Sequence, residues 1–152
     1  MTNNRRRVRS WSRELETWAE RHRRKSKWAW GETDCGTLTR EALRVMFGRS
    51  IIEADYHSRT GALRFMRELS CDIGDYLETF GARALPLREV HGLWSFDGLI
   101  GGDIVVRMCY DGPLPALAIS IDGKNLLTSD PQRGPHWIGT RDLLYGAQPY
   151  RF

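Results

Sequence analysis

Cys35 is the residue whose type and position could do chemistry in this chain. Apolar residues recur at three- and four-residue spacing over 38–46, which predicts an amphipathic helix with Gly48 as its stop. Asp34 suits an N-cap, so Cys35 would occupy the first helical position, where the helix terminus favours thiolate over thiol. A thiolate held there is half of a nucleophilic site, because it also needs an adjacent base, usually histidine.

Cys35 also has a structural interpretation, since reduced cysteine is among the most buried residue types and packs as a small hydrophobe. The residues before it favour a built site. Trp28 and Trp30 are two apart, as on one face of an extended segment, and Gly31 permits a tight turn between this segment and the helix. Both interpretations stay open from these residues alone.

Three further helices are expected around this one. The first spans residues 10–24, with Ser10 as its N-cap and with an inward face formed by Trp11, Leu15, Trp18 and His22. We expect this helix to dock beside residues 28–35. A second helix begins at Ser58 or Thr60 and runs through residue 69, and a third covers residues 72–80 and stops at Gly81.

The second half of the chain changes from helical to strand periodicity. Short β-branched or alternating runs predict strands at residues 104–106, 117–121, 124–128, 137–138 and 147–152. Asp122-Gly123 predicts a hairpin turn, residues 129–134 a polar turn, and residues 85–93 a linker. Helices followed by an antiparallel meander indicate an α+β fold, with N-terminal helices packed on a C-terminal sheet.

Composition narrows the class of protein. A chain of 152 residues with 41% hydrophobic residues is long enough to bury one core. Its three cysteines, Cys35, Cys71 and Cys109, are widely spaced and odd in number, so we interpret them as reduced thiols rather than as disulfides or zinc ligands. We expect no metal and no cofactor. No stretch has the length of a membrane span or resembles a signal segment.

The net charge of +4 is distributed unevenly. Residues 1–27 carry ten Arg or Lys against three Glu, whereas the rest carries thirteen against sixteen. We therefore divide the chain into a basic arm with an amphipathic helix, 1–27, and a body, 28–152. Residues 1–9 are expected to be a flexible basic tail in isolation. The residues proposed to bind a partner are Arg5, Arg6, Arg7, Arg9, Trp11 and Trp18; a solvated face without a partner is the alternative.

Three short blocks carry a family resemblance. Trp30-Gly31-x-x-Asp34-Cys35 comes first, Gly-Asp-Ile-Val-Val at 102–106 second, and Ala-Leu-Ala-Ile-Ser-Ile-Asp-Gly-Lys at 116–124 third. In this order they resemble the NlpC-type cell-wall peptidases, a papain-like family, from about Trp28 to the C-terminus. The resemblance is closest to a divergent branch encoded in tail gene clusters of tailed phages and prophages. It implies a papain-like domain over 28–152 with Cys35 in the nucleophile position.

One departure separates the chain from active members of that family. The resemblance aligns Ala116 with the general-base histidine and Thr128 with the third polar group. A thiol without its base loses a rate factor of roughly 10²–10⁴. Of the four histidines, only His136 follows the predicted sheet closely enough to approach Cys35, so it is the candidate substitute base.

Two functions follow from this resemblance. The first is a non-catalytic structural or adaptor protein of a phage tail tip or tail assembly, made in the host cytoplasm and incorporated into the virion. Its partners would be other tail proteins, such as hub, distal-tail or tail-tip subunits. The alternative is an active cysteine endopeptidase or amidase that cuts peptidoglycan with Cys35. Nucleic-acid binding ranks last, because the arginines form no recognised reading motif.

Overall fold

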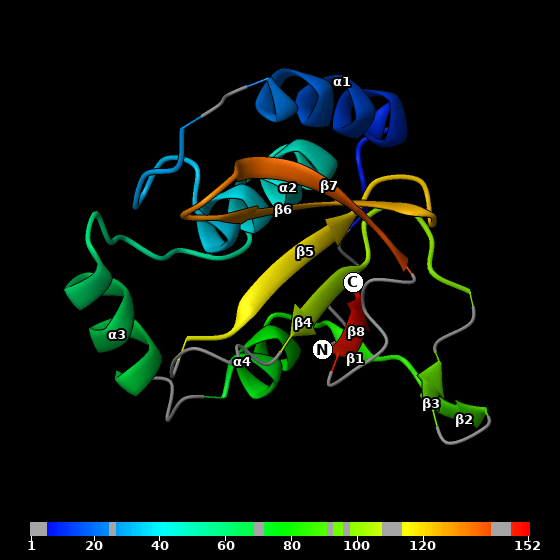
Figure 1. The fold of residues 1–152 in the computed structure, drawn as a ribbon. Coiled ribbons are helices and arrows are strands. Elements are labelled where there is room, and N and C mark those ends of the chain that lie inside the picture. Colours follow the sequence, from blue (N-terminus) through cyan, green and yellow to red (C-terminus); the bar gives the residue numbers. More distant parts are fainter. Residues whose placement is uncertain are drawn as a thin grey trace.

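Four α-helices precede an antiparallel sheet in the part of the chain that the computed structural model describes (Figure 1). The described residues are 6–24, 27–68, 72–90, 93–95, 98–107, 114–140 and 147–152. The predicted α+β class is confirmed. The predictions for Arg5, Cys71, His91 and Cys109 lie outside the described residues.

The helices lie close to their predicted bounds. They are α1 (Trp11–Arg23), α2 (Cys35–Phe47), α3 (Arg59–Glu68) and α4 (Ile73–Thr79). Gly48 ends α2 in the left-handed conformation at φ 67°, as predicted. Ser10 precedes α1 without capping its first turn, and its hydroxyl contacts Glu14 instead. None of the described helices has the length and apolar composition that crossing a membrane requires.

The main sheet has the strand order β1-β8-β4-β5-β6-β7, and all of its pairs are antiparallel. Its strands are β1 (Arg83–Ala84), β4 (Ile104–Arg107), β5 (Ala116–Ser120), β6 (Asn125–Asp130), β7 (Gly134–Gly139) and β8 (Ala147–Arg151). Strands β4 to β7 form the predicted meander, and the chain end returns as β8 between β1 and β4.

Two features of the second half differ from the sequence predictions. The segment 85–93, predicted as a linker, contains β2 (Arg88–Val90) and reaches β3 (Leu93–Ser95), and these two strands form a separate hairpin. The predicted polar turn at 129–134 is confined to residues 131–133, because β6 and β7 extend into it. Strands β2 and β3 have three residues each, too few to show an alternating pattern in the sequence. Their strand conformation therefore depends on their pairing with each other.

The core lies between α2 and the sheet. Helix α2 contacts β5 and β6, and α1 packs on α2 and reaches β7 (Figure 1). This core includes the buried side chains of Leu15, Leu38, Met46, Ile104, Ile119 and Leu127. Because side chains alternate along a strand, Val105, Ala118 and Leu126 form a second buried cluster on the opposite face.

The N-terminal segment, expected to be flexible in isolation, packs against the rest of the chain from Arg7 onward. The Arg7 guanidinium lies 4.3 Å from the centre of the Trp11 ring and donates to the Phe152 carbonyl at 3.4 Å. The Val8 N–H donates to the Met46 carbonyl at 2.9 Å. These contacts join the N-terminal segment to the end of α2 and to the last residue of the chain.

Three of the five described residues proposed to bind a partner, Arg7, Trp11 and Trp18, therefore serve the fold. Trp18 is 6% exposed and Trp11 packs against the same core, so α1 shares one core with the body. This burial of a tryptophan stripe is the docking of α1 that the sequence predicted. Among the described residues of the proposed set, Arg6 and Arg9 are the exposed ones.

A buried ion pair joins β4 to β8. Asp103, directly before β4, is 0% exposed, and Arg151 of β8 binds it through two N–H···O contacts of 2.8 and 2.7 Å. The Ile100 N–H donates to the same carboxylate at 2.9 Å. The hydrogen bonding raises the pKa of Arg151 above its ordinary value. The two hydrogen bonds from Arg151 replace the hydration that the Asp103 carboxylate loses when it is buried.

Replacing Arg151 with alanine should lower the free energy of unfolding by about 3 kcal/mol, because the buried Asp103 carboxylate then keeps only one donor. Urea denaturation measures this loss. Arg133→Ala is the matched control, since Arg133 also pairs with a carboxylate, Asp130 at 2.8 Å, but has a side chain that is 65% exposed. We expect the control to lose less than about 1 kcal/mol. Equal losses would contradict the structural role assigned to Arg151.

Candidate functional site at the start of α2

The carboxylate of Asp34 organises the site. It is 2% exposed and accepts hydrogen bonds from four donors, and none of its partners among the described residues is a cationic side chain. The donors are the Thr37 N–H at 3.0 Å, the Thr37 hydroxyl at 2.7 Å, the Gly31 N–H at 2.7 Å and the Tyr56 hydroxyl at 2.8 Å. Asp34 is thus the predicted N-cap of α2, and it also holds the Trp-Gly turn and the loop of Tyr56 against the helix start.

Two glycines allow this close approach. Gly31 has φ 74°, and a Cβ there would collide with the backbone of Tyr56 and the ring of His57. A Cβ at Gly36 would overlap the Tyr56 hydroxyl. Glycine at 31 therefore serves the tight turn that the sequence predicted and the contact with a loop that it did not.

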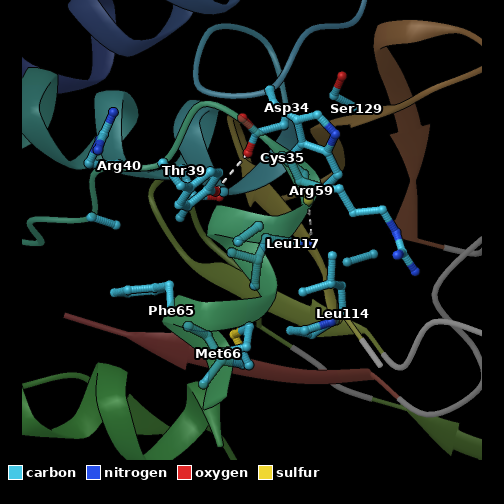
Figure 2. A pocket seen from close by; sticks show the side chains of 18 of the residues that line it. Asp34, Cys35, Thr39, Arg40, Arg59, Phe65, Met66, Leu114, Leu117 and Ser129 are labelled. Atoms are coloured by element: carbon cyan, nitrogen blue, oxygen red, sulfur yellow. Dashed lines mark hydrogen bonds between the residues drawn. The ribbon is translucent and has the colours of Figure 1, made fainter. Parts of the chain in front are cut away.

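Cys35 is the first residue of α2, as predicted, and it occupies the place where the ladder between β5 and β6 ends. The paired residues of these strands stop at Ile119 and Leu127. Further along β5, the Leu117 N–H donates to Cys35 Sγ at 3.4 Å, and the Leu117 carbonyl accepts the Thr128 hydroxyl at 2.7 Å. The thiol is thus bound to a backbone donor of the sheet (Figure 2).

The expected base is absent from this position. Ala116 precedes Leu117 and lines the cleft beside Cys35, and Thr128 uses its hydroxyl on a backbone carbonyl. His136 lies on β7, beyond β6, where its Nδ1 donates to the Gly134 carbonyl at 2.7 Å and its Nε2 is 3.6 Å from Asp130. No histidine is among the described residues that line the cleft.

Asp130 is a poor substitute base. It lines the cleft from the end of β6, and burial by itself would raise its pKa. Hydrogen bonds and charge from Arg133, together with the Gln132 N–H, outweigh that effect and hold the pKa of Asp130 below its ordinary value. A carboxylate with a lowered pKa is a weak proton acceptor for a thiol.

A cleft of about 320 Å³ opens beside Cys35. Its walls come from the turn before α2, from α2, α3 and α4, and from the starts of β5 and the end of β6. They are mainly apolar or aromatic, including Trp28, Trp30, Tyr56, Phe65, Met66 and Leu114 (Figure 2). Such a cleft suits an apolar group rather than a hydrated ion. No group of three or more His, Cys, Asp or Glu side chains within the described ranges could hold a metal ion.

The polar groups of the cleft are unequally satisfied. Its two carboxylates, Asp34 and Asp130, are both hydrogen-bonded, whereas Arg40 and Arg59 have no ion pair with any described residue. The Ser129 hydroxyl is buried and has no hydrogen-bond partner in the described part of the chain. Among the described residues, no ion pair balances the positive charges of Arg40 and Arg59.

The comparison with protein families covers nearly the whole chain. Residues 6–144 match a family described as "Domain of unknown function (DUF6950)". The chain belongs to this family. The DUF6950 match begins at residue 6 and so includes α1 with the body, in agreement with their common core. No curated protein and no solved structure matches the chain.

The structure brings together several residues that the sequence singled out: Trp30, Asp34, Cys35 and Ala116 line one cleft of this DUF6950 domain, and Gly31 donates to Asp34. Sequence reasoning missed several other cleft residues that carry a polar group, among them Arg40, Tyr56, Arg59 and Ser129. These come from three separate elements and a loop, and no motif spacing links them. The one local signal was the polar Ser129-Asp130 pair after an apolar strand, which we interpreted as a turn.

Tyr56→Phe should lower the free energy of unfolding by about 2 kcal/mol at pH 7, because it removes a donor from a buried carboxylate. Burial, followed by the charge of Asp34, raises the pKa of Tyr56 well above its ordinary value. Folding thus favours the protonated phenol. The Tyr56 hydroxyl therefore contributes fully to the free energy of unfolding below the pKa of tyrosine in the unfolded chain, about 10, and this contribution declines as the pH rises above that value.

Urea denaturation between pH 7 and 11 tests both statements. The decline in stability above pH 10 should be shallower in Tyr56→Phe than in the wild type. Tyr76→Phe is the control, since burial also raises the pKa of Tyr76 but its hydroxyl binds a backbone carbonyl, Glu53, at 3.3 Å. An alkaline decline that is identical in the wild type and Tyr56→Phe would contradict the assignment.

Proposed function

We propose that this DUF6950 domain is a non-catalytic structural or adaptor protein of a phage tail tip or tail assembly, built on a papain-like, NlpC-type fold. Three features support the fold: the cysteine on the first residue of α2, the packing of α2 across an antiparallel sheet, and the approach of β5 to that cysteine. The tail assignment rests on the family resemblance of the motifs at Trp30 to Cys35, 102–106 and 116–124.

One observation carries the non-catalytic assignment: Ala116 stands beside Cys35 where active peptidases place their base. Asp130, the cleft carboxylate at the end of β6, has its pKa lowered by its own donors, and the Asp34 carboxylate is occupied by four hydrogen bonds. One partner of Cys35 is the Leu117 N–H of β5, which donates to the sulfur and accepts no proton. A thiol in this setting lacks the general-base contribution of roughly 10²–10⁴ in rate.

In this proposal the protein is made in the host cytoplasm and becomes part of the virion tail, with hub, distal-tail or tail-tip subunits as partners. The exposed Arg6 and Arg9 offer positive charge to such a partner. The helix α1 is unsuited to a deletion test, because removing it would open the core at Leu15 and Trp18.

The alternative function is an active peptidoglycan endopeptidase or amidase that uses Cys35. The observation in its favour is that Cys35 lies at a helix N-terminus in an open cleft and accepts an N–H hydrogen bond, and both features favour thiolate. Peptidoglycan would then be the ligand of the cleft.

Ala116→His should restore a base next to the thiol. In a Cys71→Ser, Cys109→Ser background, we expect Cys35 of this variant to react with iodoacetamide at pH 7 about tenfold or more faster than in the parent chain, because an adjacent imidazole promotes the thiolate. Ala116→Asn is the polar control without a base and should react like the parent. The parent should release no Cys35-dependent fragments from purified sacculi.

Two results would contradict the proposal. Release of peptidoglycan fragments by the parent chain, abolished in Cys35→Ala, would make the protein an enzyme. Equal alkylation rates in Ala116→His and Ala116→Asn would show that position 116 does not face the thiol as it does in the papain-like arrangement.

Mature virions of the phage or prophage that encodes the chain should contain it. Purified particles, washed and separated from host lysate by density gradient, are probed for an epitope-tagged full-length chain. Arg6→Gln with Arg9→Gln should reduce incorporation if the basic segment docks, whereas Arg64→Gln with Arg67→Gln removes the same charge from the exposed face of α3 as a control. Particles without the chain would contradict the tail assignment.

A further inference from the structure

We infer that the cleft beside Cys35 is a docking site for a peptide segment of another protein, one that carries a large apolar side chain next to an acidic residue. This inference deepens the proposed function by naming the surface and the kind of partner that an adaptor would use. It rests on that function only in that the segment belongs to a partner protein. The apolar walls, the positive charge and one buried hydroxyl each point to a part of the ligand.

The apolar walls call for a large apolar side chain. Aromatic rings line one side of the cleft in edge contact, with Trp28 and Trp30 at 4.6 Å between centroids and Trp30 and Tyr56 at 6.2 Å. Phe65 and Met66 extend this surface from α3. A volume of about 320 Å³ is near the lower limit of ligand pockets, roughly 300–1,000 Å³, so it suits one or two side chains rather than a whole helix.

The charges call for a carboxylate. Arg40 of α2 and Arg59 of α3 lie on either side of Cys35 in the view of Figure 2. Neither has an ion pair with a described residue, while the carboxylates of Asp34 and Asp130 already have their own donors. A planar guanidinium group binds a planar carboxylate through two parallel hydrogen bonds, so an acidic side chain is a suitable ligand for these arginines.

The buried hydroxyl calls for a polar backbone. Ser129 is 6% exposed, lines the cleft, and has an Oγ without a hydrogen-bond partner in the described part of the chain. Buried polar atoms in folded proteins are nearly always satisfied, so an orphan at a cleft marks a place for a ligand group. A peptide C=O or N–H would satisfy it, whereas an aliphatic chain would not. This is why the site favours a peptide over a fatty acid.

A random-peptide display selection on the immobilised full-length chain tests the inference. We expect the enriched sequences to share a Phe, Trp, Leu or Met beside an Asp or Glu. The consensus peptide is then synthesised with a fluorescent label, and its binding is measured by fluorescence polarisation at two salt concentrations. Affinity should fall as salt rises, because part of the binding is ionic.

Matched variants locate the peptide. Arg40→Gln with Arg59→Gln should weaken binding about tenfold or more, whereas Arg64→Gln with Arg67→Gln, which removes equal charge from the part of α3 outside the cleft, should leave it unchanged. Ala116→Phe should block the cleft. Ser129→Ala should weaken binding severalfold while the thermal midpoint is equal to or above that of the parent, since it removes an unsatisfied buried group.

Several outcomes would overturn the inference. These are the absence of enriched peptides, a consensus without acidic residues, binding that survives both the double arginine variant and Ala116→Phe, and binding of dodecanoate in place of any peptide. The peptide is also recovered after incubation with the protein, and its mass is measured by mass spectrometry to detect cleavage. Cleavage of the peptide that depends on Cys35 would contradict the non-catalytic proposal but not the docking site. Absence of peptide binding, with no cleavage, would contradict the docking site but not the non-catalytic proposal.

Discussion

The buried carboxylate of Asp34 is the interaction on which the rest of the site depends. Moving an ionised carboxylate out of water is costly unless hydrogen bonds replace its hydration. Here the first turn of α2, the Trp-Gly turn and the loop of Tyr56 supply those bonds, so the three segments are held together by one side chain. The start of α2 is thereby placed, and with it the sulfur of Cys35 against Leu117 of β5.

Asp103, directly before β4, is a second buried carboxylate, and its hydration is replaced by a different set of donors. Its carboxylate is satisfied by the guanidinium of Arg151 and by one backbone N–H. Strand β8 lies between β1 and β4, and this pairing brings Arg151 to Asp103. Arg7 lies over the Trp11 ring and donates to the carbonyl of Phe152, the residue after Arg151. One buried acid therefore organises the cleft, and the other fastens β8 to the start of β4.

The cleft combines Cys35, which the family resemblance puts in the nucleophile position, with polar groups that lie outside that resemblance. The thiol is bound to a sheet N–H, its expected base is Ala116, and the local carboxylates are engaged elsewhere. The groups without partners among the described residues are the cations of Arg40 and Arg59 and the hydroxyl of Ser129. A binding site for an acidic, apolar segment uses all three, and such use of an enzyme-like scaffold is consistent with function residing in sites rather than folds.

The local elements of this chain were predictable because their signals are local. Periodicity located all four described helices, and residue types alone identified Asp34 as the cap, Gly48 as the stop and the 122–123 turn. The same reasoning placed Cys35 at the first helical position, whereas only the family resemblance pointed to Ala116. Reasoning from local signals failed for the hairpin of β2 and β3, whose strands are too short to show a pattern, and for Arg7, whose burial depends on Trp11 and the distant Phe152.

Only the tertiary structure decided which charges are satisfied. From the sequence, Arg7 and Arg40 are equivalent surface cations, and Asp34 and Asp130 are polar residues near ends of elements. Folding half-buries Arg7 against a ring and a carbonyl, leaves Arg40 facing a cleft, and surrounds Asp34 with donors from three segments. Caps and periodicities involve neighbours in the chain and are written locally, whereas a hydrogen bond from Tyr56 to Asp34 exists only after separate segments have packed.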